Sequence, residues 1–171
     1  MSGAEAQRPG GAAAKSGGMN ELTVDDLAGE FDTVVVCTPD VQGRLLGRRL
    51  TLDAFLRGVD RGVDMCTAAF AWDIVQDPMG MVGALEWTGF HTGWHDLRLE
   101  ADLATLRPAG WLTRTAVCLA DAVEVHDGSP VAVAPRSILR RQVDALAADG
   151  FTALTGTELE LYLYLGTPEE N

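Results

Sequence analysis

Short apolar runs separated by turn residues make up most of the chain between residues 33 and 133, a pattern typical of a sheet built from short strands. The run at 33–38 is followed by turn chemistry at 39–43 and a second strand-like segment at 44–50, which together predict a β-hairpin. Further strands are expected at residues 63–74, 96–99, 104–106, 113–125 and 131–133. The central part of the chain is therefore predicted to be rich in β-structure.

Short helices interrupt this pattern at two places. Residues 21–30 carry apolar positions on one side, and the segment at 51–57 begins with Thr51, whose hydroxyl suits an N-terminal cap. Because strands and helices do not alternate regularly, the pattern favours an α+β fold over a parallel βαβ fold. We expect residues 19–133 to form one domain. The Gly-rich residues 1–18 cannot bury enough apolar surface and are predicted to be a disordered tail.

The carboxyl-terminal segment has the clearest helical pattern. Pro135 suits the first position of a helix and Gly150 its C-terminal cap, so a helix is predicted at residues 135–149. Residues 154–165 then alternate strictly, with leucine at four successive odd positions, and predict a strand with one apolar face. Because that face needs an apolar partner, we expect residues 134–171 to begin a second domain and the chain to be the front portion of a larger protein.

Composition narrows the class of protein. The chain has 171 residues, of which 47% are hydrophobic and 22% charged, as in an ordinary globular domain. Its formal net charge of −12 disfavours nucleic-acid binding, because phosphate backbones would be repelled. No apolar run reaches the roughly 18 residues of a membrane span, so no membrane partner is expected. The widely spaced Cys37, Cys66 and Cys118 are expected to be free thiols in a reducing compartment, and we predict a cytoplasmic protein.

Glu158 and Glu160 are the first candidates for chemistry. On a strand, side chains two residues apart project from the same face about 7 Å apart. Two carboxylates on a rigid sheet suit hard divalent cations such as Mg²⁺ or Mn²⁺, which prefer oxygen ligands. The spacing alone leaves a second interpretation open, in which both residues are solvated charges on an exposed strand face.

Five segments, in their order along the chain, resemble a known family. They are Asp40-Val-Gln-Gly-Arg44-Leu-Leu-Gly-Arg48, Gly93-Trp-His-Asp96, Asp102-Leu-Ala-Thr-Leu-Arg107 with Trp111, Pro135-Arg-Ser-Ile-Leu-Arg140 and Thr157-Glu-Leu-Glu-Leu161. Together they resemble the glutamine synthetase family over residues 20–165. The order of the Asp-Leu-Ala-Thr-Leu-Arg block and the later Glu-x-Glu pair is more specific than any single segment.

The resemblance implies an amino-terminal β-grasp domain, followed by the first helix and strand of a truncated catalytic domain. It also implies an ATP-dependent ligase that joins glutamate to an amine through a γ-glutamyl phosphate. By that match, Glu158 and Glu160 would each bind a different one of two active-site cations, Mg²⁺ or Mn²⁺. The family further implies a homo-oligomeric ring whose active sites lie between subunits, with ATP, glutamate and an amine as ligands.

The sequence departs from the ammonia-specific pattern of this family at residues 65–69. That pattern has Phe-Asp-Gly-Ser-Ser, whose Asp helps to bind ammonium, whereas this chain has Met65-Cys-Thr-Ala-Ala69. The chain looks more like the γ-glutamylpolyamine and γ-glutamylethanolamine synthetase branch, and Asp73 and Asp96 become the candidates for facing the amine. The residues alone leave another interpretation open, in which Asp73 is a turn residue and Asp96 a cap or a surface charge.

Two functions remain open at this point. In the first, the chain is a fragment of the ligase and should not catalyse the reaction alone, because most of the catalytic domain is missing. In the second, it is a non-catalytic β-grasp interaction module, or a truncated paralogue, that docks on a full-length synthetase.

Overall fold

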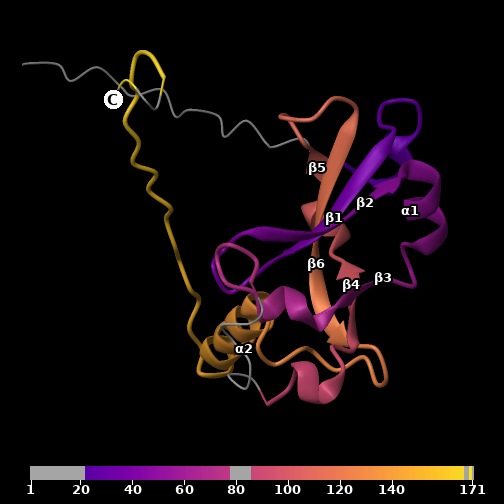
Figure 1. The fold of residues 1–171 in the computed structure, drawn as a ribbon, viewed down its shortest axis with the longest axis vertical. Coiled ribbons are helices and arrows are strands. Elements are labelled where there is room, and N and C mark those ends of the chain that lie inside the picture. Colours follow the sequence, from indigo (N-terminus) through magenta and orange to yellow (C-terminus); the bar gives the residue numbers. More distant parts are fainter. Residues whose placement is uncertain (1–21, 78–85, 168–169, 171) are drawn as a thin grey trace, which may run out of the picture.

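A mixed sheet forms the centre of the computed structural model, which describes residues 22–77, 86–167 and 170 (Figure 1). The predicted disordered tail at residues 1–18 lies outside the described residues. The strands are β1 (Thr33–Pro39), β2 (Leu45–Thr51), β3 (Val63–Cys66), β4 (Asp96–Ala101), β5 (Arg107–Pro108) and β6 (Thr115–Glu124). Their order is β2-β1-β6-β4-β3, with β5 paired to β6. The central pair β1–β6 is parallel and the other pairs are antiparallel.

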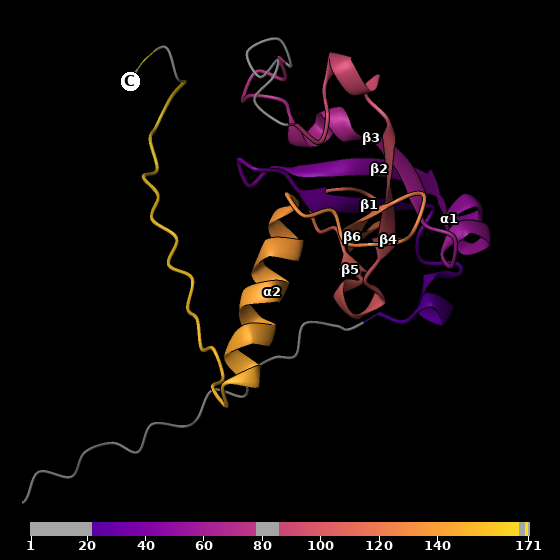
Figure 2. The same cartoon turned by 90° about the horizontal axis from the view of Figure 1, so that it is seen from below.

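Helices are short except at the carboxyl-terminal end. The α-helices are α1 (Leu52–Gly58) and α2 (Pro135–Ala148), and the 3₁₀ turns are η1 (Val24–Leu27), η2 (Thr67–Phe70), η4 (Phe90–Thr92) and η5 (Leu103–Thr105). Figures 1 and 2 place α1 and α2 at opposite sides of the sheet. Within the described ranges, no helix is long and apolar enough to cross a membrane.

The hydrophobic core lies between α1 and the sheet. Phe55 of α1 is 1% exposed and packs in one cluster with buried residues of the neighbouring strands. Members from the sheet include Val34, Val36, Leu97 and Leu99. Burial of these side chains provides the main driving force for assembling the β1–β2 hairpin, α1, β4 and β6 into one unit.

Most of the predicted elements are present in the sheet domain. The β1–β2 hairpin is confirmed, and α1 begins as expected, because the Thr51 hydroxyl accepts a hydrogen bond from the Ala54 amide at 3.2 Å. The strand predicted at 63–74 is wrong after Cys66, where the chain turns into η2. The Thr67 amide still bonds to the His95 carbonyl in the β3–β4 register, and the turn follows it, where the Ala71 amide bonds to the Ala68 carbonyl.

Three shorter predictions also need correction. The helix expected at 21–30 is only the single 3₁₀ turn η1, whose Leu27 is fully buried. The extended structure expected at 104–106 is replaced by the turn η5, where the Thr105 amide bonds to the Asp102 carbonyl. The strand expected at 131–133 is also a turn, in which the Ala134 amide bonds to the Val131 carbonyl. In all three places local turn hydrogen bonds prevail over a short apolar pattern.

The strand predicted at residues 154–165 is wrong for this structure. The helix α2 is confirmed, but the segment after it forms no strand and leads away from the sheet in both ribbon views (Figures 1 and 2). Leu159 and Leu163 are 85% and 91% exposed. A strand is stabilised by pairing with a neighbour, and no described strand pairs with this segment. The apolar stripe of α2 is exposed as well, with Leu139 64% and Val143 44% exposed.

Candidate functional site

The turn between β1 and β2 is built around a buried carboxylate. The Asp40 side chain is 1% exposed, and its Oδ1 accepts hydrogen bonds from the amides of Gln42 at 2.9 Å and Arg44 at 2.8 Å. Its Oδ2 accepts a third bond from Arg44 Nε at 2.7 Å. Aspartate forms such turns readily because its short side chain reaches the backbone amide two residues further on.

Arg44 connects this turn to a loop about thirty residues later in the sequence. Its Nη1 donates to the Ile74 carbonyl at 2.8 Å, and its Nη2 donates to the Asp73 carbonyl at 2.9 Å. Gln42 adds a bond from its Nε2 to the Trp72 carbonyl at 3.2 Å. The main chain that carries Asp73 is therefore fixed against the tip of the β1–β2 hairpin.

The carboxylate of Asp73 organises its own loop. Its Oδ1 accepts hydrogen bonds from the amides of Val75 at 2.9 Å and Asp77 at 2.8 Å. These bonds are those of a turn residue, which is the alternative interpretation of Asp73 that the sequence left open. Both of these bonds use Oδ1 and serve the turn. A role of the carboxylate toward an amine remains a prediction.

Asp96 begins β4 and lies opposite the last residue of β3, Cys66. Its side chain is exposed. The backbone just before it is held firmly, because Thr67 donates to the His95 carbonyl through both its amide, at 2.9 Å, and its hydroxyl, at 2.7 Å. Trp94, two residues before Asp96, has a φ of 52°, a left-handed conformation that is uncommon for a bulky residue.

A cluster of aromatic and polar side chains packs around the segment that leads into Asp96. The sequence did not reveal this cluster. Trp87 Nε1 donates to Glu124 Oε1 at 2.6 Å, and His95 Nε2 lies 4.0 Å from Glu124 Oε2. The rings of Trp87 and His95 meet edge to face, with centroids 5.4 Å apart. The hydroxyls of Thr67 and Thr88 are hydrogen-bonded to each other in the interior. No spacing motif links Glu124 to residues 87 and 95, so only the folded chain shows this group.

Glu158 and Glu160 lie apart from these loops, on the exposed segment that follows α2. Among the residues described, no group of three or more His, Cys, Asp or Glu side chains is placed to hold a metal ion. The chemistry of the pair still fits Mg²⁺ or Mn²⁺, because both side chains offer exposed carboxylate oxygens. Two ligands fill only part of an octahedral shell, so the metal role of Glu158 and Glu160 remains a prediction.

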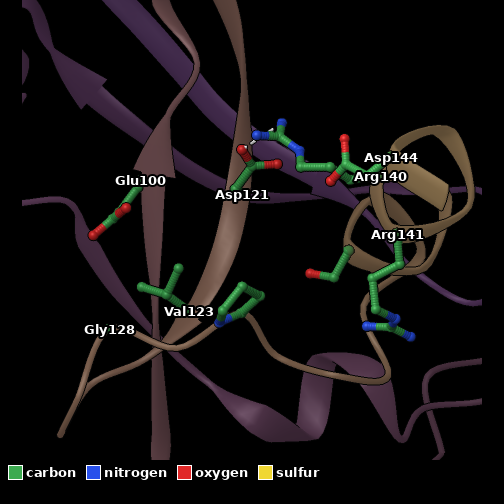
Figure 3. Close-up of a pocket in the computed structure, with 9 residues that line it drawn as sticks. Glu100, Asp121, Val123, Gly128, Arg140, Arg141 and Asp144 are labelled. Carbon is green, nitrogen blue, oxygen red and sulfur yellow. Dashed lines mark ion pairs between the residues drawn. The ribbon is translucent and has the colours of Figure 1, made fainter. Parts of the chain in front are cut away.

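An open pocket of about 430 Å³ lies between β4, β6 and α2 (Figure 3). Its wall includes an ion pair between Arg140 and Asp121 at 2.8 Å. Beside it, Arg136 donates to Asp121 at 2.8 Å and to Asp102 at 2.7 Å. Burial opposes the charged form of Arg136, but the hydrogen bonds and charges of Asp121 and Asp102 outweigh it and raise the pKa of the guanidinium. These ion pairs attach α2 to the sheet, and no predicted site residue lines the pocket.

Comparison with solved structures defines the class of this domain. A crystal structure of a novel glutamine synthase homolog superposes with a TM-score of 0.56 at 22% identity, covering 70% of this chain and 27% of that one. The chain therefore has a mixed α/β fold that is present in glutamine synthetase homologues. No protein-family model matches the sequence.

Comparison of sequences then establishes the relationship. The chain is 42% identical over 153 residues to gamma-glutamylethanolamide synthetase GlnA4 of Streptomyces coelicolor, covering 89% of this chain and 32% of that protein. It is 29% identical over 134 residues to a glutamate–isopropylamine ligase of a Pseudomonas species, covering 78% of this chain and 28% of that protein. The chain is homologous to the glutamine synthetase-like ligases, as its motifs indicated. It spans about a third of the length of these curated relatives.

Proposed function

We propose that this chain is the amino-terminal part of an ATP-dependent glutamate–amine ligase. The observation that carries the proposal is the 42% identity to a γ-glutamylethanolamide synthetase over 89% of the chain. In this proposal residues 19–133 are the β-grasp domain and residues 134–171 begin the catalytic domain. The parallel central pair β1–β6, with α1 packed against the sheet, supports the β-grasp assignment. The exposed apolar stripe of α2 is consistent with a surface that further protein would cover.

The proposed reaction has two steps. The glutamate side-chain carboxylate attacks the γ-phosphorus of ATP, which forms γ-glutamyl phosphate and releases ADP. The amine nitrogen then attacks the carbonyl carbon, and phosphate leaves with the electron pair of the broken C–O bond. Both partners in the first step are anions, and a bound divalent cation would neutralise part of their charge. Glu158 and Glu160 would hold Mg²⁺ or Mn²⁺ through their carboxylate oxygens.

Asp73 and Asp96 would act on the amine side. A carboxylate binds an alkylammonium group by charge-assisted hydrogen bonds and can accept the proton that the amine must lose before it attacks. The names of the relatives point to amines that carry a carbon chain. We therefore propose an acceptor such as ethanolamine or a polyamine. As in the family, the active sites would lie between the subunits of a homo-oligomeric ring in the cytoplasm.

The test measures phosphate release by the full-length protein and by its Asp73 and Asp96 variants. Ammonia, putrescine, spermine and ethanolamine are offered with ATP and glutamate, and the preferred amine is used for KM measurements. Asp73→Asn and Asp96→Asn should each raise the amine KM about tenfold, the equivalent of one charge-assisted hydrogen bond, and leave the glutamate KM unchanged. The exposed Asp60, in the turn after α1, provides the matched control Asp60→Asn. An amine KM that is the same in all three variants would remove Asp73 and Asp96 from the amine site.

A further inference from the structure

Arg44 joins two segments that are far apart in the sequence. Its Nε bonds to Asp40, while its Nη1 and Nη2 bond to the carbonyls of Ile74 and Asp73 at 2.8 and 2.9 Å. A planar guanidinium presents its donors in a fixed fork, so several bonds at once restrict its orientation strongly. One side chain therefore relates the tip of the β1–β2 hairpin to the loop that carries Asp73.

The hairpin end of this connection is rigid. The Asp40 carboxylate is 1% exposed and accepts three hydrogen bonds, two of them from backbone amides of its own turn. The Arg44 side chain is 27% exposed, so its bonds are partly shielded from water. Hydrogen bonds between charged groups are about twice as strong as neutral ones and lose less strength to screening when they are shielded.

The loop end is held by hydrogen bonds and hardly at all by buried side chains. Ile74 and Val75 are each 76% exposed, so burial of their side chains contributes little to the conformation of the loop. The bonds from Arg44 go to main-chain carbonyls, and they fix the direction of the Asp73–Ile74 and Ile74–Val75 peptide units. The Asp73 carboxylate in turn depends on this backbone for its bonds to the Val75 and Asp77 amides.

We infer that Arg44, held by the buried Asp40, is a positioning residue that sets the direction of the Asp73 carboxylate in the proposed amine site. This inference rests on the proposed function, because only that function gives Asp73 a ligand. Arg44 acts through the main chain of residues 73 and 74 and does not itself contact the amine.

The first test measures hydrogen exchange of the Val75 and Asp77 amides. Arg44→Ala should speed their exchange about tenfold, because the loop loses two of its anchoring bonds, and Arg44→Lys should give a smaller increase because one donor is retained. The matched control is Arg57→Ala, which removes an exposed Arg paired to Asp53 on α1. Unchanged exchange at both amides in a folded Arg44→Ala protein would overturn the inference. If Arg44→Ala does not fold, Arg44→Lys is compared with the unsubstituted protein, and unchanged exchange at both amides would overturn the inference.

The second test measures KM values in the full-length ligase. Arg44→Ala should raise the amine KM by a factor close to that of Asp73→Asn, leave the glutamate KM unchanged, and be partly rescued by Arg44→Lys. If Asp73→Asn raises the amine KM and Arg44→Ala does not, the positioning role is wrong and the proposed function stands. If neither variant changes the amine KM, the amine site itself has been placed wrongly, and the inference falls with it.

Discussion

Gly47 allows β1 and β2 to approach each other more closely than any other residue would permit. A Cβ atom added at Gly47 would lie 2.0 Å from the Val36 carbonyl oxygen and 2.6 Å from Cys37 Cα, whereas real Cβ atoms keep at least 3.0 Å from such atoms. The Gly47→Ala variant can form only if the two strands separate locally by about 1 Å. Val36 is 1% exposed in the core, so this shift also disturbs packing on the far side of β1.

The expected cost follows from these two effects. Separation weakens about two ladder hydrogen bonds, each worth about 1 kcal/mol net. The displacement of the buried Val36, whose carbonyl oxygen faces Gly47, adds about 1–2 kcal/mol. Gly47→Ala should therefore lower the free energy of unfolding by about 3 kcal/mol, measured by urea denaturation followed by circular dichroism. The same variant should disturb the Asp40–Arg44 turn, which lies at the end of the same hairpin.

Gly58 provides the matched control. It ends α1, has no positive φ, and its added Cβ would meet no heavy atom within 4 Å. Gly58→Ala should be neutral or stabilise the protein by up to about 1 kcal/mol, because alanine reduces the entropy of the unfolded chain. Equal stability of the Gly47→Ala and Gly58→Ala proteins would refute the close approach of β1 and β2.

Two further predictions concern the thiols and the attachment of α2. Burial raises the pKa of the Cys37 and Cys118 thiols. At pH 8 both should therefore react with iodoacetamide far more slowly than the half-buried Cys66. Equal rates of the three thiols, measured by mass spectrometry, would contradict this order. Arg136→Ala removes the cation paired with Asp102 and leaves Asp121 paired with Arg140 alone, and it should cost about 1–2 kcal/mol in urea denaturation, with faster amide exchange in α2. A loss no larger than that of the exposed Arg61→Ala would show that these ion pairs do not attach the helix.

Local patterns in the sequence predicted the elements that depend on local chemistry. The turn residues at 39–43, the cap at Thr51 and the pair Pro135 and Gly150 each mark a boundary that the structure contains. The segment at 154–165 failed because a strand exists only with a neighbour, and alternation of residues does not supply one. A leucine face therefore predicts that a segment needs an apolar partner, and the residues that the structure describes do not provide one.

The sequence could predict which residues belong to the candidate site, but not the contacts between them. The motif that contains Asp40 and Arg44 was visible in the sequence, as were Asp73 and Asp96. Their connection was not, because Arg44 bonds to carbonyl groups about thirty residues away, and every residue has a carbonyl group. Side-chain identity cannot indicate which main-chain groups will meet. Glu124 was missed for a related reason, since its contacts with residues 87 and 95 depend on strand register.

The most direct test of the central proposal is detection of the product made by the full-length protein. Mass spectrometry should find a γ-glutamyl amide after incubation with ATP, glutamate, Mg²⁺ and either ethanolamine or a polyamine, with one phosphate released for each amide formed. Omission of glutamate or of the amine should abolish the product. Absence of a γ-glutamyl amide with ammonia, putrescine, spermine and ethanolamine alike, from a folded protein, would contradict the assignment of this chain to a glutamate–amine ligase.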